Sequence, residues 1–157
     1  MSTLLAVTLA LVTVNNVLAI TQVNECSGHS SGKRLEVNIH GCEAPPCVLK
    51  KNTNATVEIR FVPVQKVEKL VNRVFARVIF PLPFVGVDGE SSCDSIYLPT
   101  GGKAGCPVDA GTEYLYKQSF EIHSYYPSIS PTVHWALLDS DSGESVVCFE
   151  VKSSIQS

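Results

Sequence analysis

The 157-residue sequence is poor in charge, and its charged residues are not clustered. Lys and Arg together number 12, Asp and Glu number 15, and the formal net charge is −3. A mildly acidic chain without runs of Lys or Arg lacks the basic surface that nucleic acids require, and it would not be held tightly to an anionic membrane surface. We therefore expect no nucleic-acid partner.

The sequence also lacks the motifs of common catalytic sites. It has no Gly-x-Ser-x-Gly nucleophile elbow. The glycine-rich segment 101–104 has the wrong spacing for a phosphate-binding loop and carries Ala104 where that loop needs Ser or Thr. The spacing of the six cysteines fits no common zinc finger. Cysteines joined in disulfides leave no thiol nucleophile, so we expect no enzyme, no metal and no cofactor.

Residues 1–19 have the composition of a signal peptide. They are rich in Leu, Val and Ala, contain no charged side chain, and end in Val17-Leu18-Ala19, which places a small residue at the cleavage site. A retained membrane anchor is the alternative, but the stretch is short for a bilayer span of about 20 residues, and Asn15-Asn16 interrupts it. We expect residues 20–157 to form a single exported domain whose cysteines become disulfides.

Alternation of apolar and polar residues predicts an all-β domain. The period-2 pattern of half-buried strands appears in residues 35–39, 57–61, 74–84, 114–122, 133–137 and 147–151. These patterns place Leu35 on a buried face, and they place Val78 and Phe80 on the buried face of one long strand. Pro81 and Pro83 within that strand predict a sheet edge or a place where the sheet opens. Turns rich in Pro and Gly join the strands, which favours an antiparallel β-sandwich.

The six cysteines allow 15 pairings, and the sequence alone does not choose among them. Spacing favours short closed loops: Cys42 and Cys47 flank a tight turn, and Cys93 and Cys106 flank a polar loop. The remaining pair would then join the two ends of the domain. Separately, Asn54-Ala55-Thr56 is an N-glycosylation acceptor sequence at the start of a predicted strand.

Residues 20–157 resemble the Niemann-Pick type C protein 2 family, also called epididymal secretory proteins, within the ML (lipid-recognition) domain superfamily. The resemblance covers essentially this whole range, with the six cysteines in family order. It rests on the joint order and spacing of several motifs, which include Gly41-Cys42 with Pro46-Cys47-Val48-Leu49, Pro81-Leu82-Pro83-Phe84, Cys106-Pro107-Val108, Tyr126-Pro127-Ser128-Ile129, Val133-x-Trp135-x-Leu137-x-Asp139 and Cys148-x-Glu150. The acceptor sequence at Asn54 also lies at the strand that the family often glycosylates.

The resemblance implies an immunoglobulin-like two-sheet antiparallel sandwich with an apolar cavity between the sheets, and non-covalent binding of sterols or other lipids. It implies the disulfides Cys26–Cys148, Cys42–Cys47 and Cys93–Cys106. The family's pocket mouth carries over to Phe84, Ile122 and Tyr126. Resemblance and strand parity together give the wall candidates Phe61, Leu82, Phe120, Val133, Trp135 and Phe149.

The chain departs from the family's sterol carriers at three places. The His-Gly pair usual in the long strand is replaced by residues 74–77, which read Val-Phe-Ala-Arg, and Glu121 stands where the family often has Pro. Residues 85–87 read Val-Gly-Val where the family continues with prolines. Because of these changes we expect a ligand of the sterol or similar lipid class, and we do not specify cholesterol.

We expect a monomeric carrier of a sterol or similar lipid, resident outside the cell or in the endosome–lysosome lumen. A membrane sterol transporter or receptor is left open as a partner, and no residues are assigned to that contact. The alternatives are a recognition module for microbial lipids such as lipopolysaccharide, a carrier of fatty acids or hydrophobic semiochemicals, and a structural domain with a filled core.

Overall fold

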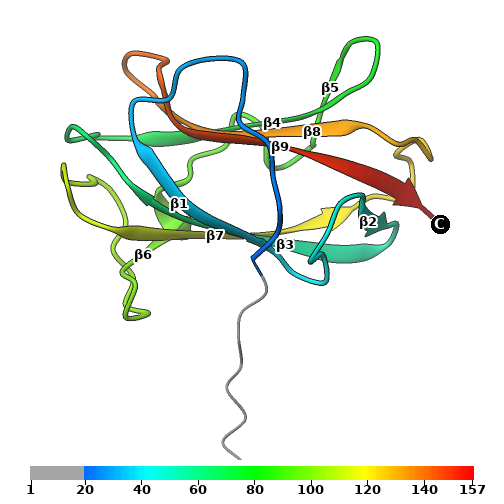
Figure 1. The fold of residues 1–157 in the computed structure, drawn as a ribbon, viewed down its shortest axis with the longest axis horizontal. Helices are drawn as coiled ribbons and strands as arrows, with labels where there is room; N and C mark the ends of the chain where they lie inside the picture. The colour runs from blue at the N-terminus through cyan, green and yellow to red at the C-terminus, as the bar shows by residue number, and fades with distance from the viewer. Residues whose placement is uncertain (1–19) are drawn as a thin grey trace, which may run out of the picture.

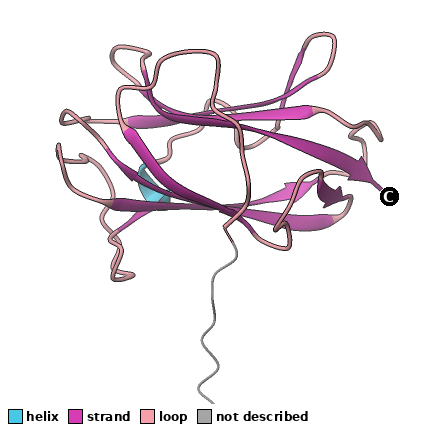
Figure 2. Ribbon diagram, in the orientation of Figure 1, coloured by secondary structure: helices cyan, strands magenta, loops and turns pink. Residues whose placement is uncertain are grey.

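The computed structural model describes residues 20–157, so the predicted signal peptide, residues 1–19, lies outside the described residues. In the described range the chain forms two β-sheets packed face to face (Figures 1 and 2), and its helical structure is a single 3₁₀ turn, Cys93–Ser95. The prediction of an all-β sandwich is confirmed. No described helix is long and apolar enough to cross a membrane.

The two sheets contain four and five strands. In spatial order the smaller sheet is β1 (Lys33–Ile39), β3 (Thr53–Val62), β7 (Tyr114–Ile122) and β6 (Ile96–Tyr97). The larger sheet is β2 (Cys47–Lys50), β9 (Ser145–Gln156), β8 (Thr132–Asp139), β4 (Leu70–Arg77) and β5 (Pro81–Pro83). Neighbouring strands are antiparallel except β2 and β9, which run parallel, so the predicted antiparallel pairing holds for all but this edge.

The core lies between the sheets, where the inward-facing residues of each strand meet. Ile59 and Phe61 of β3, Trp135 of β8 and Phe149 of β9 are at most 1% exposed. Successive residues of a strand point to opposite faces, so the alternating sequence pattern buries one face of each sheet. Tyr116 is also buried in this core. Its hydroxyl donates a hydrogen bond to the side-chain oxygen of Asn72 over 2.8 Å.

Two predicted strands differ from the structure. Leu35 is 38% exposed, because the register of β1 against β3 shifts between Arg34 and Glu36 and places the extra residue outside the ladder. The expected long strand 74–84 is instead a hairpin of β4 and β5. Its tip holds Val78 and Phe80, which are 46% and 62% exposed rather than buried.

The prolines explain why this segment does not continue as a central strand. Proline has no N–H to donate to a sheet ladder. The chain therefore turns at residues 78–80 and returns as β5, the edge strand, where Pro83 lies opposite Phe75 and Pro81 lies opposite Arg77. The expectation that Pro81 and Pro83 mark a sheet edge is confirmed.

Three disulfides join segments of the sandwich, with the pairing that the family resemblance implied. Cys26–Cys148 ties the N-terminal segment to β9, with 5.9 Å between the two Cα atoms. Cys42–Cys47 closes the turn that leads into β2, and Cys93–Cys106 holds the loop around the 3₁₀ turn and β6.

The outer face of the smaller sheet carries a network of charged side chains. Glu58 of β3 accepts from Lys117 Nζ at 2.8 Å and lies 3.2 Å from His40 Nε2. Burial alone would raise the pKa of Glu58, but the hydrogen bonds and charges of Lys117 and His40 outweigh it, so the pKa is lowered from 4.5.

This shift predicts the acid sensitivity of the fold. Because the pKa of Glu58 is lower in the folded chain, the charge of Glu58 stabilises the fold above about pH 4.5, and this contribution is lost as the pH falls through the folded pKa. Glu58→Gln should lower the free energy of unfolding at pH 7 by about 1 kcal/mol and flatten its decline below pH 4.5. Denaturant titrations between pH 7 and pH 3 measure both. Glu68→Gln, at an exposed carboxylate, is the control, and an unchanged decline in Glu58→Gln would contradict the assignment.

Candidate functional site

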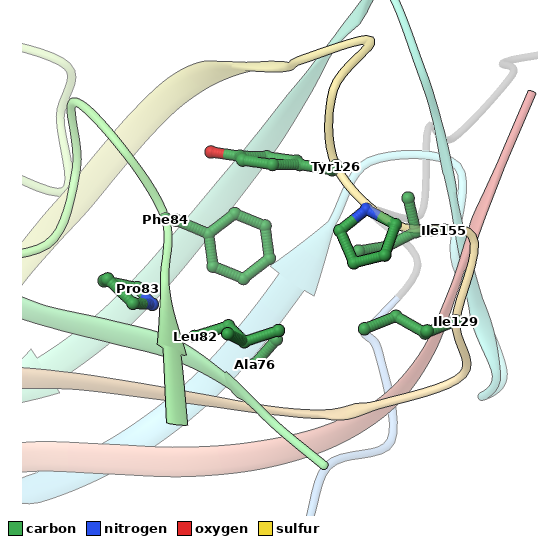
Figure 3. Close-up of a pocket in the computed structure, with 8 residues that line it drawn as sticks. Ala76, Leu82, Pro83, Phe84, Tyr126, Ile129 and Ile155 are labelled. Carbon is green, nitrogen blue, oxygen red and sulfur yellow. The ribbon is translucent and has the colours of Figure 1, made fainter. Parts of the chain in front are cut away.

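Two small apolar cavities lie towards the end of the sandwich where β7 and β9 finish. The outer one, here called the mouth cavity, is lined by residues of β4, β5, β9 and the β7–β8 loop, namely Ala76, Leu82, Pro83, Phe84, Tyr126, Pro127, Ile129 and Ile155 (Figure 3). The second, the inner cavity, is enclosed by residues of both sheets that include Phe120, Trp135 and Phe149. No charged side chain lines either cavity.

Phe84 separates the two cavities and contributes to the wall of both. It directly follows β5, its N–H donates to the carbonyl oxygen of Val74 at 3.1 Å, and it is 3% exposed. Its ring meets the rings of Phe120 and Tyr126 edge to face, with centroids 5.6 Å apart in each case. Figure 3 shows the ring between Tyr126 and Leu82 at the mouth.

The aromatic contacts continue from the mouth into the core. The ring centroids of Phe120 and Trp135 lie 5.4 Å apart. The rings of Trp135 and Phe149 are parallel, with centroids 6.5 Å apart. Tyr126, Phe84, Phe120, Trp135 and Phe149 therefore form an unbroken aromatic row, and every member lines at least one cavity. A flat apolar molecule entering this space would meet ring faces and edges along its length.

The mouth has two lips, the segment after β5 and the β7–β8 loop. The backbone N–H of Val85 donates to the hydroxyl of Tyr126 over 3.0 Å and joins them. Burial raises the pKa of Tyr126, the hydrogen bond from Val85 opposes the rise, and the nearby charges of Tyr125 and Glu121 add to it. The Tyr126 hydroxyl is therefore uncharged at physiological pH and remains a neutral hydrogen-bonding group.

Seven of the nine predicted contact residues line these cavities. Leu82 and Tyr126 line the mouth cavity, Phe84 lines both, and the inner cavity is lined by Phe120, Val133, Trp135 and Phe149. Ile122 and Phe61 are fully buried and line neither. Phe61 instead packs against Tyr114, with ring centroids 6.1 Å apart. Ligand contact by these nine side chains remains a prediction.

Sequence reasoning missed other residues of the cavity walls. Strand parity could have found Ala76, which lies two residues beyond buried Val74, and Ala55, which lies two before Val57. Ile129 belongs to a motif already singled out, although its place at the mouth was not predicted. The parallel strand β2 contributes Cys47 and Leu49 to the inner cavity, and no local pattern signals that placement.

Both cavities are small in this closed form. Each has a volume of about 20 Å³, which is room for about one water molecule. Pockets that hold drug-sized molecules usually measure about 300–1,000 Å³. A lipid can enter only if the lips separate and the Phe84 ring moves so that the two cavities merge.

Large apolar side chains stand in solvent beside the mouth. At the tip of the β4–β5 hairpin, Ile79 is 97% exposed, with Val78 and Phe80 beside it, and Val85 on the lip is 56% exposed. The hairpin projects from the body of the sandwich in Figure 1. Clustered exposed apolar side chains on a folded domain mark a surface that contacts another apolar surface.

One cluster of potential metal ligands does not form a metal site. Cys26, His134 and Cys148 bring their ligand atoms within 4.8 Å of one another. Both cysteines are joined in a disulfide, so neither offers the thiolate that a metal requires. His134 instead lies 3.1 Å from Glu150 and stacks on Phe75.

Comparisons with known proteins identify the family of the chain and agree with its fold. A family model described as ML domain matches residues 20–155. The mouse protein named NPC intracellular cholesterol transporter 2 is 31% identical over 137 residues, covering 83% of this chain and 82% of the mouse chain. NPC intracellular cholesterol transporter 2 homolog a of Drosophila melanogaster is 29% identical, with 86% and 87% covered.

A solved structure agrees as well. The crystal structure of a Niemann-Pick type C2 protein from the Japanese carpenter ant superposes with a TM-score of 0.72 at 22% identity, covering 86% of this chain and all of that one. The likeness extends through both sheets, since it covers most of the described range. The protein therefore belongs to the ML-domain family and, within it, to the Niemann-Pick type C protein 2 proteins.

Proposed function

We propose that this protein is a secreted carrier that holds one sterol or similar lipid between its sheets without covalent chemistry and transfers it between membranes. The observation that carries the proposal is the pair of uncharged cavities divided by one aromatic ring, Phe84, at the end of an aromatic row. Relatives that span most of the chain are named as cholesterol transporters, which supports a sterol-like ligand.

The physical driving force is the burial of apolar surface. Each Å² of apolar surface removed from water contributes about 25 cal/mol, and the cavity walls present no charge that would have to be desolvated. The polar head of the lipid would remain at the mouth beside the Tyr126 hydroxyl, because burying it without partners is costly. The tail would occupy the inner cavity along Phe120 and Trp135.

The lips are suited to open. β5 has three residues and pairs only with β4, at the edge of the sheet, and the hydrogen bond from Val85 to Tyr126 joins it to the opposite lip. One such hydrogen bond contributes about 0.5–1.5 kcal/mol net. Breaking this hydrogen bond therefore costs far less than the apolar burial of a lipid returns.

The exposed hairpin tip supports transfer at a bilayer. Ile79 and Phe80 would enter the membrane interface next to the mouth, so that a lipid leaves the bilayer for the cavity without crossing water. Recognition of lipopolysaccharide is the less supported alternative, because its phosphates call for Lys or Arg at the rim and the mouth cavity is lined by neither.

The proposal predicts that the secreted protein binds lipid at one molecule per chain. Native mass spectrometry of the purified protein, before and after solvent extraction, should show a bound lipid that extraction removes. The extracted protein should then take up a fluorescent sterol, and unlabelled lipid should displace it. A protein that carries no lipid and takes up neither a sterol nor a fatty acid would be a domain with a filled core.

Phe84→Ala should weaken lipid affinity by about 10- to 100-fold, since one lost aromatic contact is worth roughly 1.5–3 kcal/mol. Equilibrium titration with a fluorescent sterol measures the change. Phe80→Ala removes the same side chain from the exposed tip and should bind with unchanged affinity. Thermal unfolding of both variants verifies the fold, and equal affinities for Phe84→Ala and the unmodified protein would remove Phe84 from the site.

Ile79→Asp should slow lipid transfer between vesicles about tenfold or more and leave equilibrium affinity unchanged. The reason is that burying an isoleucine in an apolar phase contributes roughly 1.5–3 kcal/mol, and a charge at that position opposes entry into the bilayer. Transfer is followed by fluorescence between donor and acceptor vesicles. Val64→Asp is the matched control. Val64 is 64% exposed and lies just after the C-terminal end of β3, outside the β4–β5 hairpin. Equal rates for both variants would show that the tip has no part in transfer.

A further inference from the structure

A third cavity, larger than the mouth cavity and the inner cavity, lies on the outer face of the smaller sheet. It has a volume of about 240 Å³ and is lined by Glu36, Asn38, Glu58, Arg60, Leu115 and Pro99. These side chains come from β1, β3 and β7 and from the loop after β6, and we call this space the outer groove. It does not communicate with the lipid cavities, because the sheet itself and its buried face lie between them.

The outer groove combines hydrogen-bonding groups of both kinds with a small apolar surface. Arg60 donates to Glu113 at 2.8 Å and to Glu36 at 3.1 Å. Glu58 accepts from Lys117. Leu115 and Pro99 supply apolar contacts on one side. A ligand that both donates and accepts hydrogen bonds and also has C–H faces, such as a sugar, matches this mixture.

Asn38 is the most informative member of the groove. It is only 9% exposed, yet its single side-chain hydrogen bond is to Glu58 at 3.5 Å, the limit of such contacts. Its side-chain oxygen has no donor among the described residues. The side-chain oxygen is accessible at the wall of the groove, since it is not among the buried unpaired polar atoms, and it is free to accept a hydrogen bond from a ligand there.

The acceptor sequence Asn54-Ala55-Thr56 lies on the same strand as two groove residues. Ala55 lines the inner cavity, so Asn54 and Thr56 point to the opposite, outer face, as Glu58 and Arg60 do. Asn54 is exposed. Between Asn54 and the groove lie Thr56 and its cross-strand neighbour Ser119, which are small and hydrogen-bonded to each other. The side chains of His40 and Lys117, which both reach Glu58, border this path.

We propose that an N-linked glycan on Asn54 folds back along β3 and places its first sugars in the outer groove. At about 3.3 Å per residue, Asn54 and Glu58 are separated by about 13 Å along the strand, a span that the first few sugars of an N-linked core cover. Tethering at Asn54 keeps the sugars at a high effective concentration beside the groove, so weak contacts are sufficient. Asn38, Glu58 and Arg60 would bind sugar hydroxyl and acetamido groups.

Attachment of the glycan to Asn54 is a group transfer that takes place in the secretory pathway. The proposal therefore depends on secretion of the protein, which the proposed function also assumes, but not on lipid binding. The Asn54 side-chain nitrogen bonds to the anomeric carbon of the first N-acetylglucosamine of a lipid-linked oligosaccharide diphosphate. The bond from that carbon to the diphosphate oxygen breaks, the lipid diphosphate leaves, and the amide releases one proton.

The test measures how fast a peptide-N-glycosidase releases the glycan from the folded protein secreted by animal cells. Asn38→Ala removes a groove partner, and Leu115→Trp fills the groove. Each should release the glycan about tenfold faster than the unmodified protein, the change expected when one or two net hydrogen bonds are lost. Val48→Trp introduces the same side chain at a 60% exposed position of the other sheet and should not change the rate.

Mass spectrometry establishes occupancy of Asn54, with Asn54→Gln as the unglycosylated reference. Thermal unfolding and sterol uptake of each variant establish that the fold and the lipid site are intact, so failure here is distinct from failure of the carrier function. An Asn54 without glycan, or equal release from Asn38→Ala, Val48→Trp and the unmodified protein, would overturn the proposal.

Discussion

The contact between the rings of Phe84, Phe120 and Tyr126 is the interaction on which the rest of this molecule depends. Phe84 reaches it from the strand edge, Phe120 from the opposite sheet and Tyr126 from the loop at the mouth. Each edge-to-face aromatic pair contributes about 0.5–1.5 kcal/mol of stability beyond the burial of its apolar area. These contacts stabilise the closed mouth but are weak enough to break when the mouth opens. The same rings that complete the core in the closed form would become the walls of the lipid site in the open form.

One of the three disulfides, Cys42–Cys47, stabilises a part of the sandwich that borders this space. Cys47 lines the inner cavity and begins β2, a four-residue edge strand that pairs only with β9. Without the bond from Cys47 to Cys42, so short an edge strand would be held mainly by four backbone pairs. The mouth lips carry no disulfide. The Cys42–Cys47 disulfide therefore restrains the wall of the inner cavity that β2 forms, whereas the two lips of the mouth are joined by non-covalent contacts.

The outer face of the smaller sheet is polar and charged, in contrast to the apolar interior of the sandwich. Its side chains form charged networks, such as Arg60 with Glu36 and Glu113, and the groove beside them is polar. The two faces of β3 thus have separate surroundings: Ala55 and Val57 border the inner cavity, while Glu58 and Arg60 border the outer groove. Alternation along one strand allows both, because neighbouring side chains point to opposite sides of the sheet.

The sequence by itself determined the fold class and the inward face of most strands, because a strand buried on one side must alternate with period 2. Parity and family resemblance together placed Phe120, Trp135 and Phe149 beside the cavity. Only the tertiary structure decided where alternation fails: a bulge exposes Leu35, and a hairpin places Phe80 in solvent. It alone separated Phe84, at a cavity wall, from Ile122 and Phe61, which fill the core. The physical reason is that a void depends on how residues distant in sequence pack across two sheets, whereas strand parity is a local property of the chain.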